Sequence, residues 1–301
     1  MCKALRLTED SFEPDPLKRE LSRRLISTVV LMDCTLSPSL NASCYFSSSE
    51  TTSEPCDDDE LAKIRARAPA LPQDPPSAGL LAEILRQSKL FRQVCIYHRQ
   101  GSNLEQLQAF ETQQIDWERS LHESLIYNVT NFELHRAKNT LREYTYLHLL
   151  SCHIGQLIYF PHLQSSGSNL VTDDRRLKVA SCHHYATNIT ATVQQTWNTA
   201  GFDVHNASIG QILTVSAAVL MHACLTATSR EEVEASQMRL TTINDCLTRM
   251  KEHCRIFDRV VCVEYQTSSK SLLILISVCS TRFFSRGLQG ELVFKECFRQ
   301  K

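Results

Sequence analysis

Histidine and cysteine are the residues of this chain whose chemistry could support catalysis or metal binding, and there are 11 of the first and 13 of the second. Zinc sites usually show closely spaced pairs of these residues, but neither CxxC nor HxxxH occurs. The nearest approach is His148, Cys152 and His153, of which the first two would lie one helical turn apart. We interpret them as packing residues, and we predict no catalytic residue, metal ligand or cofactor site in this chain.

Glycine-rich phosphate and nucleophile motifs are also missing from the sequence. The eight glycines form no GxGxxG, GxxxxGK[ST] or GxSxG pattern. A helical enzyme stays open as an alternative, with a site drawn from the histidines His148, His153, His183, His184 and His222. Adjacent residues point to different helix faces, so His183 and His184 are not expected to chelate one ion together.

Charge and cysteine usage restrict the class of protein further. The net charge of −1 lacks the basic excess of a free-standing nucleic-acid-binding protein. No apolar signal core follows Met1, and the cysteines are scattered, which favours reduced thiols in the cytosol or nucleus. The few glycines and prolines, 8 and 9, are typical of a chain built from helices.

Hydrophobic periodicity predicts the first helix over residues 16–36. Asp15 is its expected N-cap, and Pro16 suits the first helical position. We expect one face of this helix to be buried, consisting of the apolar residues Leu17, Leu21, Leu25, Val29, Met32 and Leu36. The Ser, Thr, Pro and acidic residues that follow predict a long loop or linker at 38–76.

Further helical patterns extend to about residue 260 and predict an all-α, irregular multi-helix array. Ser229 and Glu232 form a capping box at the start of the last helix. The charge-free stretches 144–163 and 204–229 are expected to be central core helices, with membrane spans as the alternative. Residues 1–15 are an expected N-terminal tail. The C-terminal tail 261–301 has no clear assignment, and one interpretation is that it is aberrant.

Several motifs occur in a recognisable order along these predicted helices. In the first helix, Glu20 is followed by Arg23 and Arg24, then by Asp33 nine residues after Arg24 and by Ser37 four residues further on. Later come the motifs Trp117-x-x-Ser120-Leu121, Leu147-His148-Leu149 with Pro161 thirteen residues after the histidine, and Cys182-x-x-x-Ala186. In these residues the chain resembles the fungal-specific transcription factor domain, the regulatory domain of fungal binuclear zinc-cluster transcription factors.

The resemblance implies a transcriptional regulator in the nucleus. It further implies that the chain begins inside the regulatory domain and lacks the cysteine cluster through which the family binds zinc. DNA would then be reached only through an absent or separate zinc-cluster module. Expected partners are protein: a homodimer, or a heterodimer with related regulators that a short chain could titrate. A small-molecule effector is a further expectation, whereas no membrane is expected; a membrane-associated helical protein is the alternative.

The geometry of a helix makes one structural prediction for the family-like residues. Arg24 and Asp33 are nine positions apart, so they lie on opposite sides of their helix and cannot pair with each other. We therefore expect each of them to contact another element. Asp33 is predicted to be at least partly buried beside a cationic or amide partner.

Overall fold

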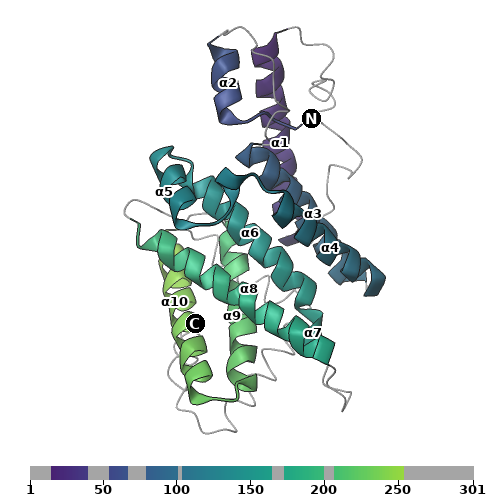
Figure 1. Ribbon diagram of the computed structural model, residues 1–301, viewed down its shortest axis with the longest axis vertical. Helices are drawn as coiled ribbons and strands as arrows, with labels where there is room; N and C mark the ends of the chain where they lie inside the picture. The colour runs from purple at the N-terminus through teal and green to yellow at the C-terminus, as the bar shows by residue number, and fades with distance from the viewer. Residues whose placement is uncertain are drawn as a thin grey trace. The chain divides into compact units, whose positions relative to one another are not determined.

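The computed structural model describes residues 15–39, 54–66, 79–100, 104–164, 173–199 and 207–253. Within these ranges there are ten α-helices and one short 3-10 helix, η1, and no β-strand (Figure 1). The predicted all-α class is confirmed, while the expected tail 261–301 and residues 1–14 lie outside the described ranges. In chain order the elements are α1 (Pro16–Ser39), α2 (Asp58–Arg65), α3 (Leu80–Gln100), α4 (Leu104–Ser120), η1 (Glu123–Leu125), α5 (Val129–Ala137), α6 (Leu141–Tyr159), α7 (Pro161–Gln164), α8 (Asp173–Trp197), α9 (Ala207–Thr226) and α10 (Arg230–His253).

The helices divide into two compact units. Unit 1 runs to Ile158 and unit 2 begins at Tyr159, so the division falls at the end of α6. The sequence predicts a single helical domain at 16–260 and has no signal for this division. Each unit has its own buried residues and is described separately below.

The start of α1 is as predicted, but its buried face is not. The Asp15 carboxylate accepts a hydrogen bond from the Leu17 N–H at 2.9 Å, which confirms the N-cap. Leu21, Leu25 and Met32, however, are about half exposed, at 46%, 54% and 57%. The residues of α1 that are buried with Leu85 of α3 are Ile26, Val30 and Cys34. The predicted stripe is wrong for these three residues because α1 has two apolar faces, and only its contact with α3 selects one. Leu17 and Val29 are partly buried, and the side chain of Leu36 lies outside what the structure describes.

Adjacent residues of α1 should therefore differ in their contribution to stability. Ile26→Val removes one methylene from a side chain that is 1% exposed, and it should lower the unfolding free energy of unit 1 by about 0.5–1.5 kcal/mol. Leu25→Val changes a half-exposed side chain and should stay within about 0.5 kcal/mol of wild type. Urea unfolding of the two variants checks this, and equal losses would restore the predicted stripe.

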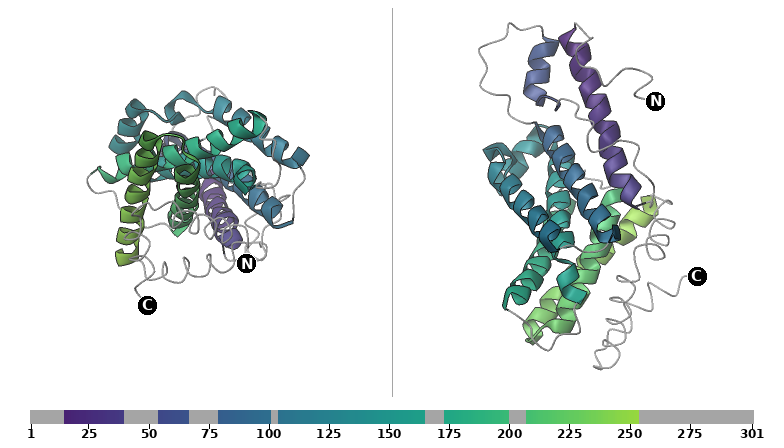
Figure 2. Two further views of the ribbon diagram at one scale, coloured as in Figure 1. Left: turned by 90° about the horizontal axis from the view of Figure 1, so that it is seen from below. Right: turned by 90° about the vertical axis from the view of Figure 1, so that its right-hand side faces the viewer.

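A helix lies inside the segment predicted to be a loop. The Asp57 carboxylate caps α2 by accepting the Glu60 N–H at 2.6 Å. The acidic residues Asp58, Asp59 and Glu60 fill the first turn, and Lys63 and Arg65 lie in the last turn. This order complements the helix dipole. The prediction of a loop at 38–76 is thus wrong for residues 58–65, where the acidic run marks a helix N-terminus. Figures 1 and 2 show α2 beside the N-terminal part of α1.

In unit 1, side chains of α6 contact both α3 and α4. The Tyr97 ring of α3 meets Phe110 of α4 edge-on at 5.9 Å between centroids. Gln114 of α4 donates a hydrogen bond to the Ser151 hydroxyl of α6 at 2.8 Å. Most of α6 is buried, including Leu147, Leu149 and Ile154 at 0% exposure. The interpretation of the charge-free stretch from residue 144 as a core helix is confirmed for these residues.

Unit 2 consists of α7 to α10, and α9 packs against both α8 and α10 (Figures 1 and 2). On α8, Cys182 and Ala186 lie one turn apart, and both are 0% exposed. The capping box at the start of α10 is confirmed: the Ser229 hydroxyl accepts the Glu232 N–H at 3.2 Å, and the Glu232 carboxylate accepts the Ser229 N–H at 3.3 Å.

Candidate functional site: the polar junction of unit 1

Glu20 and Arg24 of α1 bind the segment that leads into α2. Glu20 is 2% exposed, and its Oε1 accepts hydrogen bonds from Arg24 Nε at 3.1 Å and from the Cys56 N–H at 3.0 Å. Arg24 also donates to the Cys56 carbonyl at 2.8 Å and to the Asp58 carboxylate at 2.6 Å. Arg23 adds a longer ion pair to Glu20 at 3.8 Å. These contacts fasten residues 56–58 to the N-terminal part of α1.

Arg86 of α3 fastens the same segment from the other side. Its guanidinium makes two hydrogen bonds to the Glu54 carboxylate, one of them 2.8 Å long from Nε. A third hydrogen bond, at 2.8 Å, goes to the buried Glu83. Glu83 in turn accepts the indole N–H of Trp117, on α4, at 2.8 Å. We call the whole set the polar junction; its members are Glu20, Arg24, Glu54, Asp58, Glu83, Arg86 and Trp117.

Gly79 is required where α3 begins beside this junction. A Cβ atom at this position would lie 2.6 Å from the Cα of Asp57, closer than real Cβ contacts allow. The absent side chain lets the start of α3 approach the N-cap of α2 closely. The two backbone segments and the ion pairs together determine where α2 lies relative to α1 and α3.

The electrostatics of the junction stabilise charge and disfavour thiol reactivity. Burial lowers the pKa of Arg24, but the hydrogen bond to Asp58 and its charge, together with the hydrogen bonds to Glu20 and Cys56, outweigh this and raise the pKa above its ordinary value. For Arg86, the hydrogen bond to Glu54 is the main cause of a raised pKa. Burial, with the neighbouring Glu20, raises the pKa of the Cys56 thiol to about 12. A thiol held protonated in this way is a poor nucleophile.

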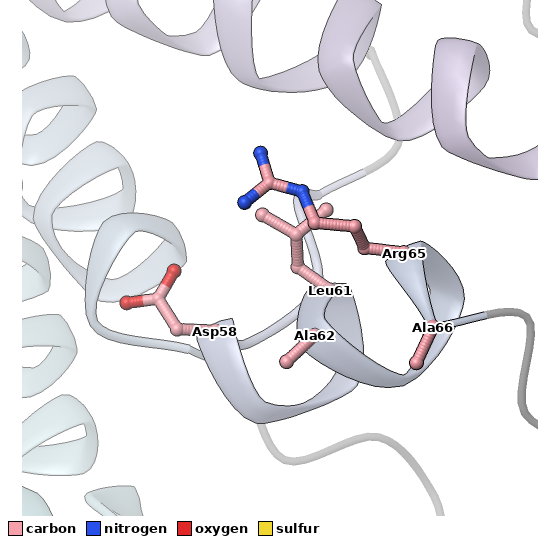
Figure 3. A pocket seen from close by; sticks show the side chains of 5 residues that line it. All are labelled: Asp58, Leu61, Ala62, Arg65 and Ala66. Atoms are coloured by element: carbon pink, nitrogen blue, oxygen red, sulfur yellow. The ribbon is translucent and has the colours of Figure 1, made fainter.

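An open hollow of about 400 Å³ lies on one face of α2, next to the junction (Figure 3). It is lined by Asp58, Leu61, Ala62, Arg65 and Ala66. These positions recur at helical spacing, so they belong to one face of α2. Asp58 thus takes part in both the junction and the hollow. None of the residues of α2 is buried, so this face is accessible to a partner.

The remaining family-like residues have separate places. Asp33 is partly buried, as predicted, and its expected cationic or amide partner stays a prediction. Ser37 lies within α1, and its side chain is outside what the structure describes. Pro161 occupies the first position of α7, where proline is favoured. Burial raises the pKa of the Cys182 thiol, consistent with a packing role for this residue on α8.

His148 joins α6 to the turn that follows α4. Its Nε2 donates to the Leu125 carbonyl at 2.9 Å. Beside it, the Tyr144 hydroxyl donates to the Ile126 carbonyl at 2.9 Å. His135 of α5 completes the cluster, with Nε2 donating to the Ser124 carbonyl at 3.1 Å and its ring stacked on Tyr144 at 4.3 Å. The interpretation of His148 as a packing residue is supported, because its hydrogen bond satisfies a loop carbonyl in the core.

The two buried histidines of α6 should make unit 1 sensitive to acid. Burial lowers the pKa of both His148 and His153 to about 4, against an ordinary value of 6.5. At pH values between 4 and 6.5, the unfolded chain binds more protons than the folded chain. The free energy of unfolding is therefore highest above pH 6.5 and falls as the pH drops toward 4. His148→Gln should reduce the slope of stability against pH by about 1.4 kcal/mol per unit near pH 5.

Urea unfolding at a series of pH values measures this slope. Leu25→Val provides the control, since it changes a half-exposed side chain that carries no ionisable group and should leave the slope unchanged. An unaltered slope in His148→Gln would mean that His148 is not a neutral buried group.

Of the five histidines considered for a catalytic site, the structure brings one pair into contact. His183 of α8 meets His222 of α9, with Nε2 and Nδ1 3.1 Å apart. His184 instead contacts Asn188 on its own helix at 3.0 Å, which confirms that the two adjacent histidines point in different directions. In unit 1, His153 packs against Phe91 at 5.5 Å between ring centroids. Sequence spacing gave no indication that His183 and His222 would meet.

The fold and the junction define an irregular all-α array in which ion pairs, some of them to the buried carboxylates Glu20 and Glu83, position a short exposed helix. Comparison with protein-family models, with curated proteins and with solved structures finds no match for this chain. The sequence motifs include Glu20, Arg24 and Trp117 of the junction, but they do not include Glu54, Glu83 or Arg86. The local signal for two of these missed residues is the spacing of three positions between Glu83 and Arg86 on one helix.

Proposed function

We propose that this chain is the regulatory, non-DNA-contacting domain of a nuclear transcriptional regulator of the fungal zinc-cluster class. The observation that carries the proposal is the polar junction. Glu20, Arg24 and Trp117, three of the residues on which the resemblance rests, belong to it, and Arg23 contacts it. Residues from separate sequence motifs thus lie in one network of hydrogen bonds and ion pairs. This common location supports the resemblance more strongly than any single motif does.

Regulation in this proposal acts through protein contact at α2. The hollow on α2 combines apolar Leu61, Ala62 and Ala66 with the charged Asp58 and Arg65. Sites for small molecules usually enclose most of their ligand, whereas this hollow is lined by one exposed helix. It is therefore better suited to a protein segment. The expected small-molecule effector, and pairing with related regulators, stay predictions.

A reporter assay tests the proposal. The whole chain is fused to a separate zinc-cluster DNA-binding module, and transcription is compared with that from the module alone. We expect a change of several-fold, and we expect Ala62→Glu in the hollow to reverse most of it. Lys63→Glu alters the neighbouring exposed residue that does not line the hollow and should have little effect. An unchanged reporter, from a fusion shown to be folded and nuclear, would contradict the proposal.

Membrane association is the second candidate and rests on α9. By length and composition, Ser208–Thr226 is the one described helix that could cross a membrane, although half of that segment is buried within the structure. Carbonate extraction of cell membranes separates the candidates. A regulator should be released into the supernatant, and retention in the pellet would favour a membrane protein.

A further inference from the structure

The contact between His183 and His222 belongs to unit 2, whereas the residues that the proposed function uses belong to unit 1. Their rings come from α8 and α9, two helices that pack directly against each other. The ring centroids are 5.3 Å apart, and the planes are inclined at 50°. Both side chains are half-buried, so each is fixed by packing while remaining accessible to solvent. The pair therefore links side chains of two packed helices.

The separation of the two ring nitrogens is compatible with a shared metal ion. Two nitrogens bound to one ion at about 2.05 Å lie about 3.3 Å apart in tetrahedral geometry and about 2.9 Å apart as neighbours in a square plane. The observed 3.1 Å between His183 Nε2 and His222 Nδ1 falls between these values. With 5.3 Å between the ring centroids, the two nitrogens face each other nearly head-on, so both side chains would have to rotate before their lone pairs met at one point.

We propose that His183 and His222 form a two-histidine binding site for a divalent late first-row transition ion such as Zn²⁺ or Ni²⁺. Imidazole nitrogen is a preferred ligand of these ions, and solvent would complete the coordination of the half-buried site. Among the described residues there is no group of three or more His, Cys, Asp or Glu side chains that could hold a metal, so these residues supply two protein ligands. This differs from the prediction that the chain holds no metal ligands.

The proton balance of binding is simple. In the empty pair, one facing nitrogen donates a hydrogen bond and the other accepts it. Burial lowers the pKa of His183, which favours its neutral form at neutral pH. When the ion binds, the ring that donated moves its proton to its distant nitrogen, and both facing nitrogens become ligands. No proton is released when both rings are neutral, and acid should weaken binding by protonating them.

Thermal unfolding of the full chain with Ni²⁺ tests the site. Nickel is the better probe here because imidazole suits it, whereas thiolates, of which this chain has 13 potential sources, strongly attract Zn²⁺. Saturating Ni²⁺ should raise the unfolding temperature of the wild-type chain by at least about 2–4 °C. His183→Ala and His222→Asn should each weaken Ni²⁺ binding at least about tenfold and abolish this rise.

The neighbouring His184 offers a matched control, since it lies on the same helix and does not contact the pair. His184→Ala should keep the full response to Ni²⁺, and Mg²⁺, which prefers oxygen ligands, should have no effect on any variant. Because a variant could fold poorly, histidine ring NMR of the wild-type chain provides a second measurement: Ni²⁺ should broaden the His183 and His222 signals first. No rise in the wild type, or an equal rise in all variants, would reduce the pair to a hydrogen bond alone.

Discussion

Replacing Glu20 with alanine is expected to lower the unfolding free energy of unit 1 by about 3 kcal/mol. The variant removes a carboxylate that is 2% exposed and takes part in two hydrogen bonds. Arg24 would keep Asp58 but lose its buried partner, and the Cys56 N–H would lose its acceptor. The segment leading into α2 should loosen as a result.

Fluorescence can follow unit 1 separately in this experiment. The chain has two tryptophans, Trp117 in unit 1 and Trp197 in unit 2. In a Trp197→Phe background, urea unfolding monitored by fluorescence therefore reports unit 1. Glu133→Ala is the control, because it removes a carboxylate whose ion pair with Arg136 is exposed, and it should cost no more than about 0.5 kcal/mol.

A less disruptive variant distinguishes charge from shape at the same position. Glu20→Gln keeps an oxygen that can accept the Cys56 N–H, but it removes the negative charge beside Arg24. Its loss should lie between those of wild type and Glu20→Ala. Equal stability of Glu20→Ala and wild type would show that the ion pairs of the junction do not determine the position of α2.

Truncation of Trp117 to alanine should have the largest effect, about 3–5 kcal/mol. The side chain is 8% exposed, and its loss would open a cavity between α3 and α4. It would also remove the hydrogen-bond donor to Glu83, a buried carboxylate. Circular dichroism during urea unfolding measures this change without relying on tryptophan emission.

Trp117→Phe separates the two contributions. Phenylalanine preserves most of the apolar packing but cannot donate to Glu83, so the expected loss is about 1.5–3 kcal/mol, the contribution of a hydrogen bond to a charged group. If Phe and Ala variants were equally unstable, the hydrogen bond would account for the whole effect. If Phe equalled wild type, Glu83 would not depend on the indole.

Local sequence signals predicted the helix boundaries that depend on neighbouring residues. The Asp15 cap and the Ser229 and Glu232 capping box involve residues two or three positions apart, so their geometry follows from the helix itself. The same kind of signal was present in the Asp57 cap of α2, but the surrounding Ser- and Pro-rich composition suggested a loop. Composition over a long segment was a poorer guide there than one capping residue.

The tertiary structure alone decided which residues meet. Periodicity along α1 could not choose between Leu25 and Ile26 because both lie on apolar faces, and the choice depends on where α3 and residues 54–58 pack. Glu20 and Cys56 are 36 positions apart, Trp117 and Glu83 are 34 apart, and His183 and His222 are 39 apart. The sequence by itself therefore determined the helical class and several helix termini, since these follow from hydrogen bonds within a turn. The polar junction and the histidine pair arise only when distant helices pack, because no local pattern encodes the distance between them.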